Sequence, residues 1–179
     1  MSSIVISGDT SGAITLAAPA VSGTNTATLP AATGTVMVSG NMPAFSAYKT
    51  SNQTGITSTV DTKITFPTEE FDTNSCYDAS NSRFTPNVAG YYHVICEMDC
   101  YGLTGLAIPR VYKNGSSFKT GASSNATCTE QYALVSALVY CNGTTDYIEI
   151  YAYLVGTAPA ISQGGGIYTF FQAYMARAA

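Results

Sequence analysis

The sequence predicts an all-β protein built as a sandwich or jelly roll. Short runs rich in Val, Ile, Thr, Tyr and Phe recur along the chain, and Gly, Pro and Asn separate them. No segment shows the 3.6-residue apolar period of an amphipathic helix. Several short strands joined by turn residues are typical of two-layer β folds. We therefore expect strands throughout the chain and no substantial helix.

Charged side chains are scarce. Asp, Glu, Lys and Arg make up 10% of the 179 residues, whereas about 25% is typical of soluble domains. Ser, Thr, Asn, Gly and Tyr therefore provide much of the surface, and we expect other subunits to cover part of it. The net charge is -4 and the seven basic residues are scattered. This excludes a nucleic-acid-binding role, because phosphate binding needs clustered Lys and Arg.

The sequence indicates a protein that folds in the compartment where it is made. It has no stretch of about 18 consecutive apolar residues, so we expect no membrane-spanning helix. The N-terminus lacks the basic region and apolar core of a secretory signal. None of the cysteines lies in a Cys-x-x-Cys pair, and their odd number supports neither a disulfide framework nor a zinc site. We expect reduced, buried thiols at Cys76, Cys96, Cys100, Cys128 and Cys141.

The composition changes near Met42-Pro43. Before this point the chain is small, apolar and rich in Thr, and after it come the aromatic residues, the cysteines and nearly all charges. We therefore predict an N-terminal attachment arm at residues 1–42 and a head domain at residues 43–179.

The arm contains four short β-prone runs separated by turn residues. These runs are residues 4–6, 13–16, 27–29 and 35–38. The arm has too few apolar groups for a core of its own. No charged residue occurs between Asp9 and Lys49, so the arm can add strands to a neighbour's sheet edges without burying an unpaired charge. The predicted arm contacts are Ile4, Ile6, Ile14, Leu16, Leu29 and Val36.

Five longer segments of the head are rich in β-branched and aromatic residues. These predicted strands are residues 89–101, 106–119, 131–141, 145–155 and 167–176. Two Asn-Gly dipeptides, Asn114-Gly115 and Asn142-Gly143, interrupt the series. Asn-Gly favours the positive φ angles of tight turns, so we expect a β-hairpin at each.

Alternation along residues 145–155 separates a core face from an outer face. The core face carries Ile148, Ile150, Ala152 and Leu154, and the outer face carries Tyr147, Glu149, Tyr151 and Tyr153. Tyrosines give rigid, amphipathic contact area. This outer face therefore suits either packing between subunits or recognition of a carbohydrate or a protein.

Residues 167–176 are apolar on both faces. One face carries Ile167, Thr169, Phe171, Ala173 and Met175, and the other carries Tyr168, Phe170, Gln172 and Tyr174. Such a strand is either central in a two-layer fold or buried against another subunit.

Residues 66–94 contain a spaced set of six residues that points to one fold. The six are Phe66, Asp72, Tyr77, Phe84, Gly90 and Tyr92. Their spacing resembles the signature of the complement C1q globular head, which belongs to the tumour necrosis factor-like jelly rolls. Two later signature positions, normally aromatic, are Val94 and Cys96 here, and both remain apolar.

The resemblance covers residues 44–179 and implies a ten-strand jelly roll that forms a homotrimer about a threefold axis. It implies termini on one side and a C-terminal strand near the centre, which accounts for the two apolar faces of residues 167–176. Phe84 and Tyr92 would fill the sandwich core, and Gly90 would open a strand where the chain must turn without a Cβ penalty. The predicted trimer interface contains Tyr151, Tyr153, Tyr168, Phe170, Phe171 and Tyr174.

The arm carries a second resemblance. Its segment GDTSGAITLAAPAVSGTNTATLPAATGTV is similar to one that recurs in structural proteins of tailed bacteriophages. Together the two resemblances imply a trimeric capsid decoration or cement protein on the virion surface, assembled in the host cytoplasm and bound to major capsid or other virion proteins by its arm. The alternative is a fibre adhesin that binds a host-surface receptor or glycan. A bacterial surface protein is a third possibility.

We expect no enzymatic activity. The loop Asp9-Thr10-Ser11-Gly12 is similar to protease loops, but an aspartic protease needs a second paired carboxylate loop and the sequence has none. A serine triad needs a histidine, and the one histidine, His93, lies within a predicted strand. We expect His93 to be a structural or interfacial side chain.

Two acidic clusters raise the question of calcium. Glu69, Glu70 and Asp72 form one, and Glu97 and Asp99 form the other. Calcium needs several oxygen ligands from converging loops, and no EF-hand-like loop is present. We expect solvated acidic residues and no cofactor, with bound calcium as the alternative.

Overall fold

The computed structural model describes residues 3–8, 10–21, 23–28, 31, 33–34, 36–122, 124–125 and 130–179. The chain divides into two compact units, Met1–Gly34 and Thr35–Ala179. This division lies before the predicted boundary at residues 42 and 43, and Met37 packs against the core of the second unit. The second unit is called the head below.

The described residues form strands and two short 3-10 turns, in agreement with the predicted all-β class. The first unit contains β1 (Ser3–Ser7) and β2 (Ala13–Ala17). The head contains η1 (Ser39–Asn41), β3 (Ala44–Tyr48), β4 (Thr62–Lys63), β5 (Thr68–Asp72), β6 (Tyr77–Asp78), β7 (Arg83–Phe84), β8 (Gly90–Lys113), β9 (Ser116–Thr120), β10 (Ser124–Asn125), β11 (Glu130–Cys141), β12 (Ile148–Ile161), η2 (Gly164–Gly166) and β13 (Phe170–Ala178).

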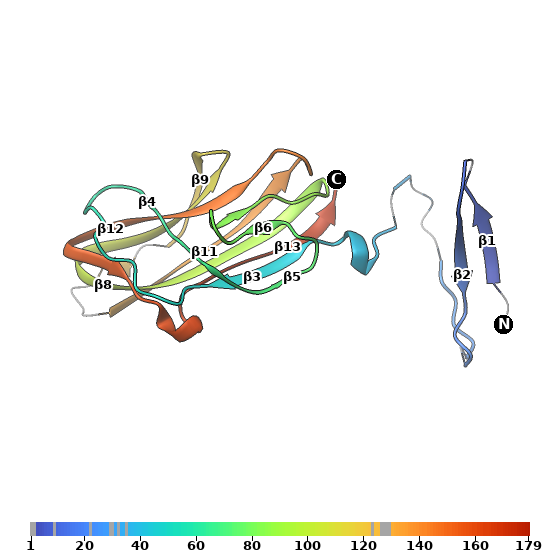
Figure 1. Ribbon diagram of the computed structural model, residues 1–179, viewed down its shortest axis with the longest axis horizontal. Coiled ribbons are helices and arrows are strands. Elements are labelled where there is room, and N and C mark those ends of the chain that lie inside the picture. Colours follow the sequence, from blue (N-terminus) through green and yellow to red (C-terminus); the bar gives the residue numbers. More distant parts are fainter. Residues whose placement is uncertain are drawn as a thin grey trace. The chain divides into compact units, whose positions relative to one another are not determined.

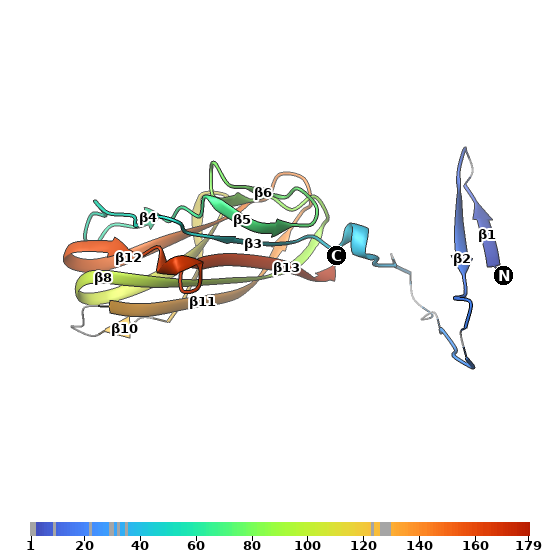
Figure 2. The same cartoon turned by 60° about the horizontal axis from the view of Figure 1, so that its bottom comes forward.

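The head is a two-layer jelly roll (Figures 1 and 2). One sheet has the order β5-β3-β13-β8-β11, and the other is built around β12, which pairs with β8, β4 and β7. All of these pairings are antiparallel. The head begins and ends at one end of the sandwich, since Ala44 pairs with Tyr174 (Figure 1).

β8 belongs to both sheets. Its first half pairs with β11 and β13, and its second half pairs with β12 and β9. The prediction of two separate strands, residues 89–101 and 106–119, was wrong, because the chain bends here and remains paired with β12 on both sides of the bend. Gly102 allows the bend: its φ is 70°, and a Cβ at this position would collide with the carbonyl of Ala158.

The two Asn-Gly turns differ. Asn114 and Gly115 both have positive φ, at 53° and 77°, and they join β8 to β9 in the predicted hairpin. The hairpin at Asn142-Gly143 was a wrong prediction, because the strands it connects, β11 and β12, lie in different sheets. The Oδ1 atom of Asn142 instead accepts hydrogen bonds from the backbone N–H groups of Thr144, Thr145 and Asp146.

Aromatic side chains from both sheets fill the core. The Phe45 ring lies 4.6 Å from the rings of Tyr77 and Phe84 and 4.8 Å from the ring of Phe171. Phe84 in turn contacts Tyr92 edge to face. The contacts of Phe45 with Tyr77 and Phe84, and of Phe84 with Tyr92, cross from one sheet to the other, so they fix the distance between the layers.

The six signature residues support this core. Phe66, Phe84 and Tyr92 are fully buried, and the Tyr77 hydroxyl donates a 2.8 Å hydrogen bond to the Phe66 carbonyl. The Asp72 carboxylate accepts hydrogen bonds from the backbone N–H groups of Asn74 and Tyr77 and so holds the turn between β5 and β6.

Gly90 has a different role from the one predicted. Its φ is not positive, so no turn requires glycine here. Instead β13 passes so close that a Cβ on Gly90 would lie 2.5 Å from the Arg177 carbonyl oxygen and 3.1 Å from the Met175 Cε.

Lys49 is buried without a counterion. Its side chain is 2% exposed, and Nζ donates hydrogen bonds to the Gln53 Oε1, the Thr65 carbonyl and the Thr65 Oγ1. All three acceptors are neutral. Desolvation by burial therefore lowers the pKa of Lys49 to about 8.

Replacing Gly90 should destabilise the head. Gly90→Ala is expected to lower the free energy of unfolding by about 1–3 kcal/mol, because the new methyl group overlaps the β13 backbone. Urea unfolding followed by tyrosine fluorescence measures this change. Gly40→Ala is the matched control, because a Cβ at Gly40 meets no atom within 4 Å. Equal stability of the two variants would contradict the close approach of β13.

Lys49 should give the head a characteristic pH dependence. Between the folded-state pKa of about 8 and the usual value of 10.5, the unfolded chain binds more protons, so the free energy of unfolding rises with pH. Urea unfolding between about pH 7.5 and about pH 9 should show the natural protein gaining stability relative to Lys49→Met. Ionisation of the tyrosines and cysteines changes the free energy of unfolding of both proteins equally, so it cancels in their difference. Parallel curves would rule out a lowered pKa at Lys49.

Candidate interaction surfaces

The first unit exposes an aliphatic face. β1 and β2 pair antiparallel, with Ile4 opposite Leu16 and Ile6 opposite Ile14. Directly opposed residues share one face of a two-stranded sheet, so these four side chains form a single patch, called the aliphatic face below. Their exposed fractions run from 56% to 67%. Exposed apolar patches of this kind are typical of interaction sites.

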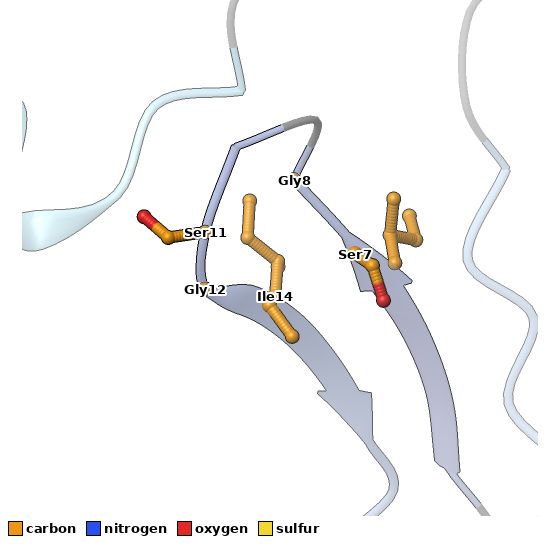
Figure 3. Close-up of a pocket in the computed structure, with 7 residues that line it drawn as sticks. Ser7, Gly8, Ser11, Gly12 and Ile14 are labelled. Carbon is orange, nitrogen blue, oxygen red and sulfur yellow. The ribbon is translucent and has the colours of Figure 1, made fainter.

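A backbone hydrogen bond closes the turn of this hairpin. The Gly8 N–H donates a 3.0 Å hydrogen bond to the Gly12 carbonyl, and Gly12 has a φ of 78°. A cavity of about 260 Å³ lies beside the turn, and Figure 3 shows Ser7, Ser11 and Ile14 around it. Asp9, which raised the protease comparison, lies outside the described residues.

The other predicted arm contacts differ from these four. Val36 is 72% exposed and lies in no strand, and Leu29 lies outside the described residues. Residues 27–28 and 36–38 form no strand either, contrary to the prediction. β-prone residues form a strand only where a second strand completes the hydrogen-bond ladder.

The head exposes a second apolar surface, on the sheet that contains β11. Every second side chain of β11 points outward, and the large outward ones are 42% to 55% exposed. Among the described strands, β11 pairs only with β8, so it is the edge strand of this sheet (Figure 2). Tyr174 from β13 and Tyr91 from β8 continue the same face. We call this set the sheet face; its members are Tyr91, Tyr132, Leu134, Leu138, Tyr140 and Tyr174.

His93 lies in the middle of the sheet face and links three strands. Its Nε2 lies 2.7 Å from the Ser136 Oγ of β11, and its Nδ1 lies 3.1 Å from the Tyr174 Oη of β13. The serine and histidine are spaced like a nucleophile and its base. However, side chains stand perpendicular to a sheet whose N–H groups lie in its plane, so this flat surface offers the serine no oxyanion hole.

Acidic and aromatic groups meet near one end of the sheet face. Asp99 is almost fully buried, and its Oδ1 has no hydrogen-bond partner. Burial raises the pKa of Asp99, and the nearby charge of Glu130 adds to the effect. Tyr132 packs against Tyr168, with ring centroids 5.3 Å apart. Within the described part of the chain, no three His, Cys, Asp or Glu side chains are arranged to hold a metal ion.

The tyrosines of β12 lie on the opposite sheet. Tyr151 stacks on Tyr112 at 3.9 Å, and Arg110 lies 5.0 Å above the Tyr153 ring. The buried Glu149 carboxylate accepts from both Lys63 and Arg83, at 2.6 and 2.9 Å. Contacts within one chain therefore organise this predicted outer face.

The structure does not bring the six predicted interface residues together. Phe171 is fully buried in the core of its own chain, so its placement at an interface was wrong. Phe170 and Tyr174 lie in the sheet that contains β11, and Tyr168, in the bend before β13, packs against Tyr132 of β11, whereas Tyr151 and Tyr153 lie on the other sheet. The alternation of β13 explains the error, because its Phe171 side faces the aromatic core and its Tyr174 side faces outward.

Sequence reasoning missed the outward residues of β11. The strand carries large residues at alternate positions, including Leu134 and Leu138, and small ones between them, including Ala133 and Ala137. The larger set would ordinarily be assigned to the core. The structure buries the small set, because aromatic rings from other strands already fill the interior.

Solved structures share this fold. The globular domain of a zebrafish complement 1qA protein is 15% identical, with a TM-score of 0.55, and the match covers 76% of this chain and 99% of that one. Murine APRIL at pH 5.0 gives 9% identity, a TM-score of 0.59 and coverages of 75% and 98%. The Eiger TNF from S. frugiperda is 9% identical, with a TM-score of 0.56, and the match covers 78% of this chain and 95% of that one. The head therefore has the predicted complement C1q/TNF-like jelly-roll fold.

By sequence, the chain matches no known family profile and no curated protein. The described residues include no helix of the length and apolarity needed to cross a bilayer. The four described cysteines, Cys76, Cys96, Cys100 and Cys141, are free and buried, as predicted, and Cys128 lies outside the described residues.

Proposed function

We propose that this chain is a homotrimeric structural protein on the surface of a tailed-bacteriophage particle. The observation that carries the proposal is the sheet face, where large tyrosines and leucines of an edge strand stand in solvent on a single chain. An apolar surface of this kind on a protein with so few charges is expected to be covered by another subunit.

A threefold assembly suits this surface. In a ring, each contact joins two different surfaces, and the ring closes when the rotation between neighbours returns to the start. The sheet face of one protomer would contact a different surface of the next. The jelly roll that the signature residues resemble implies the same symmetry, with β13 towards the axis. The exposed position of Tyr174 on the outer side of β13 supports this part of the proposal.

The arm would attach the trimer to other virion proteins. Its strands carry no charge, and residues 4–8 and 10–17 of the hairpin are exposed. An uncharged strand can pair with a neighbour's sheet edge without desolvating an ion. Three arms on one trimer would bind with avidity. The similarity of residues 8–36 to segments of phage structural proteins supports a capsid protein as the partner and the virion surface as the location.

A fibre adhesin is the second candidate, and one observation favours it. A cavity of about 460 Å³ lies where β8 bends between the sheets, lined by Thr54, Ile56, Tyr101 and Pro159, among others. This end of the head is opposite the C-terminus (Figure 1). An uncharged cavity with one aromatic side chain suits a host receptor loop or a glycan.

The sheet face gives the test of the trimer. Leu138→Lys should convert the trimer to a single protomer in sedimentation velocity, because each interface would bury an unpaired charge. Val60→Lys, a change at an exposed apolar residue of the turn before β4, should leave the mass unchanged. A Leu138→Lys protein that sediments like the natural one would exclude the sheet face from the interface.

Deleting the arm separates the two candidate functions. Removal of residues 1–34 leaves the head and Met37 intact. A decoration protein should then lose binding to bare capsids, whereas an adhesin should keep its binding to host cells. Pelleting assays with purified protein measure both. Capsid binding that survives the deletion would refute attachment through the arm.

A further inference from the structure

The aliphatic face of the hairpin has no cover within its own unit. Ile4, Ile6, Ile14 and Leu16 all point to one side, and all are more than half exposed. A two-stranded hairpin alone is at best marginally stable in water, whereas three or more strands with an apolar face can be stable. The hairpin therefore requires strands from another source.

The charge pattern favours a copy of the same chain as that source. Symmetry repeats every side chain near an axis, so one charge on the contact would become several like charges in close contact. Neither β1 nor β2 contains a charged residue, and the one charged residue between them, Asp9, lies in the segment that joins the two strands. A different protein would tolerate, and gain specificity from, complementary charges within the strands. The absence of charge from both strands fits a contact between identical strands.

Large apolar side chains are concentrated on one face of the hairpin. The face opposite the aliphatic face carries Thr15, Ala13, Ser7 and one larger apolar residue, Val5. A two-stranded ribbon inserted between two layers of a partner protein buries both of its faces, so both should be apolar. A ribbon that packs against copies of itself around an axis buries only its inner face, so one apolar face is enough. The pattern matches the second arrangement.

The tether makes this association favourable. Residues 18–34 span at most about 60 Å even when fully extended. Hairpins joined to one trimeric head therefore remain near one another at an effective concentration in the millimolar range. Association between sister hairpins needs no further partner at the concentrations at which the head itself is trimeric.

We propose that the three hairpins of one trimer pack their aliphatic faces together around the threefold axis and form a six-stranded prism. This inference rests on the proposed homotrimer. It assigns the aliphatic face to sister copies and leaves the outer strand edges, and the face with Val5 and Thr15, for the virion partner. The arm would then present one preassembled attachment unit in place of three independent ones.

Cysteine crosslinking tests the arrangement with a matched pair of variants. Ile6→Cys places a thiol on the aliphatic face, and Val5→Cys places one on the opposite face of the same strand. Both are made with Cys128→Ser. The four remaining cysteines are buried, and burial raises the pKa of the Cys96, Cys100 and Cys141 thiols, so they do not react.

Each full-length variant at micromolar concentration is treated with a short bis-maleimide and separated on a denaturing gel. Facing thiols at millimolar effective concentration should crosslink at least about 100-fold faster than thiols that meet by diffusion. Ile6→Cys should therefore give a covalent dimer rapidly, and Val5→Cys should remain monomeric on the gel.

The native mass of each variant, measured before crosslinking, separates the two possible failures. A single-protomer mass would overturn the proposed trimer and this inference with it. A threefold mass with slow crosslinking at Ile6→Cys would overturn the prism alone and assign the aliphatic face to another protein. Equally rapid crosslinking of both variants would also overturn it, because the contact would not be specific to that face.

Discussion

The register of the strands across the aromatic core is the constraint on which the rest of the structure depends. Phe45 contacts Phe84 across the two sheets and Phe171 of the neighbouring strand in its own sheet, and each ring fixes which side of its strand faces inward. Because side chains alternate along a strand, a slip of one residue would exchange core and surface. Burying Tyr92 and Phe171 turns their neighbours His93 and Tyr174 outward, so the interior packing also determines the composition of the sheet face.

Local patterns predicted those parts of the fold in which alternation and turn chemistry agree. The core face of residues 148–154 and the hairpin at Asn114-Gly115 are examples. Prediction failed where distant residues decide the outcome. Nothing near β11 indicates that its small residues face inward, since the rings that fill the core come from other strands. Phe171 and Tyr174 likewise look equivalent until pairing with β3 and β8 assigns them to opposite faces.

The low charge of the chain follows from these surfaces. The aliphatic face and the sheet face lie in different compact units, yet both expose large apolar side chains. The aliphatic face includes no charged residue, and the sheet that bears the sheet face carries few: Glu97 lies opposite Leu134, and Glu130 begins β11. Several of the other charges pair with one another within the head, where Glu149 binds Lys63 and Arg83, and Asp61 binds Arg110. A chain that pairs several of its charges internally and exposes large apolar side chains is suited to contact with its own copies.

Self-association is the central claim, and the native mass of the full-length protein at micromolar concentration tests it most directly. The account predicts three times the 18.7 kDa mass of the chain, in one species that persists on dilution. A well-folded protein with the mass of one chain would contradict it, because both apolar surfaces would then be stable in water without a partner.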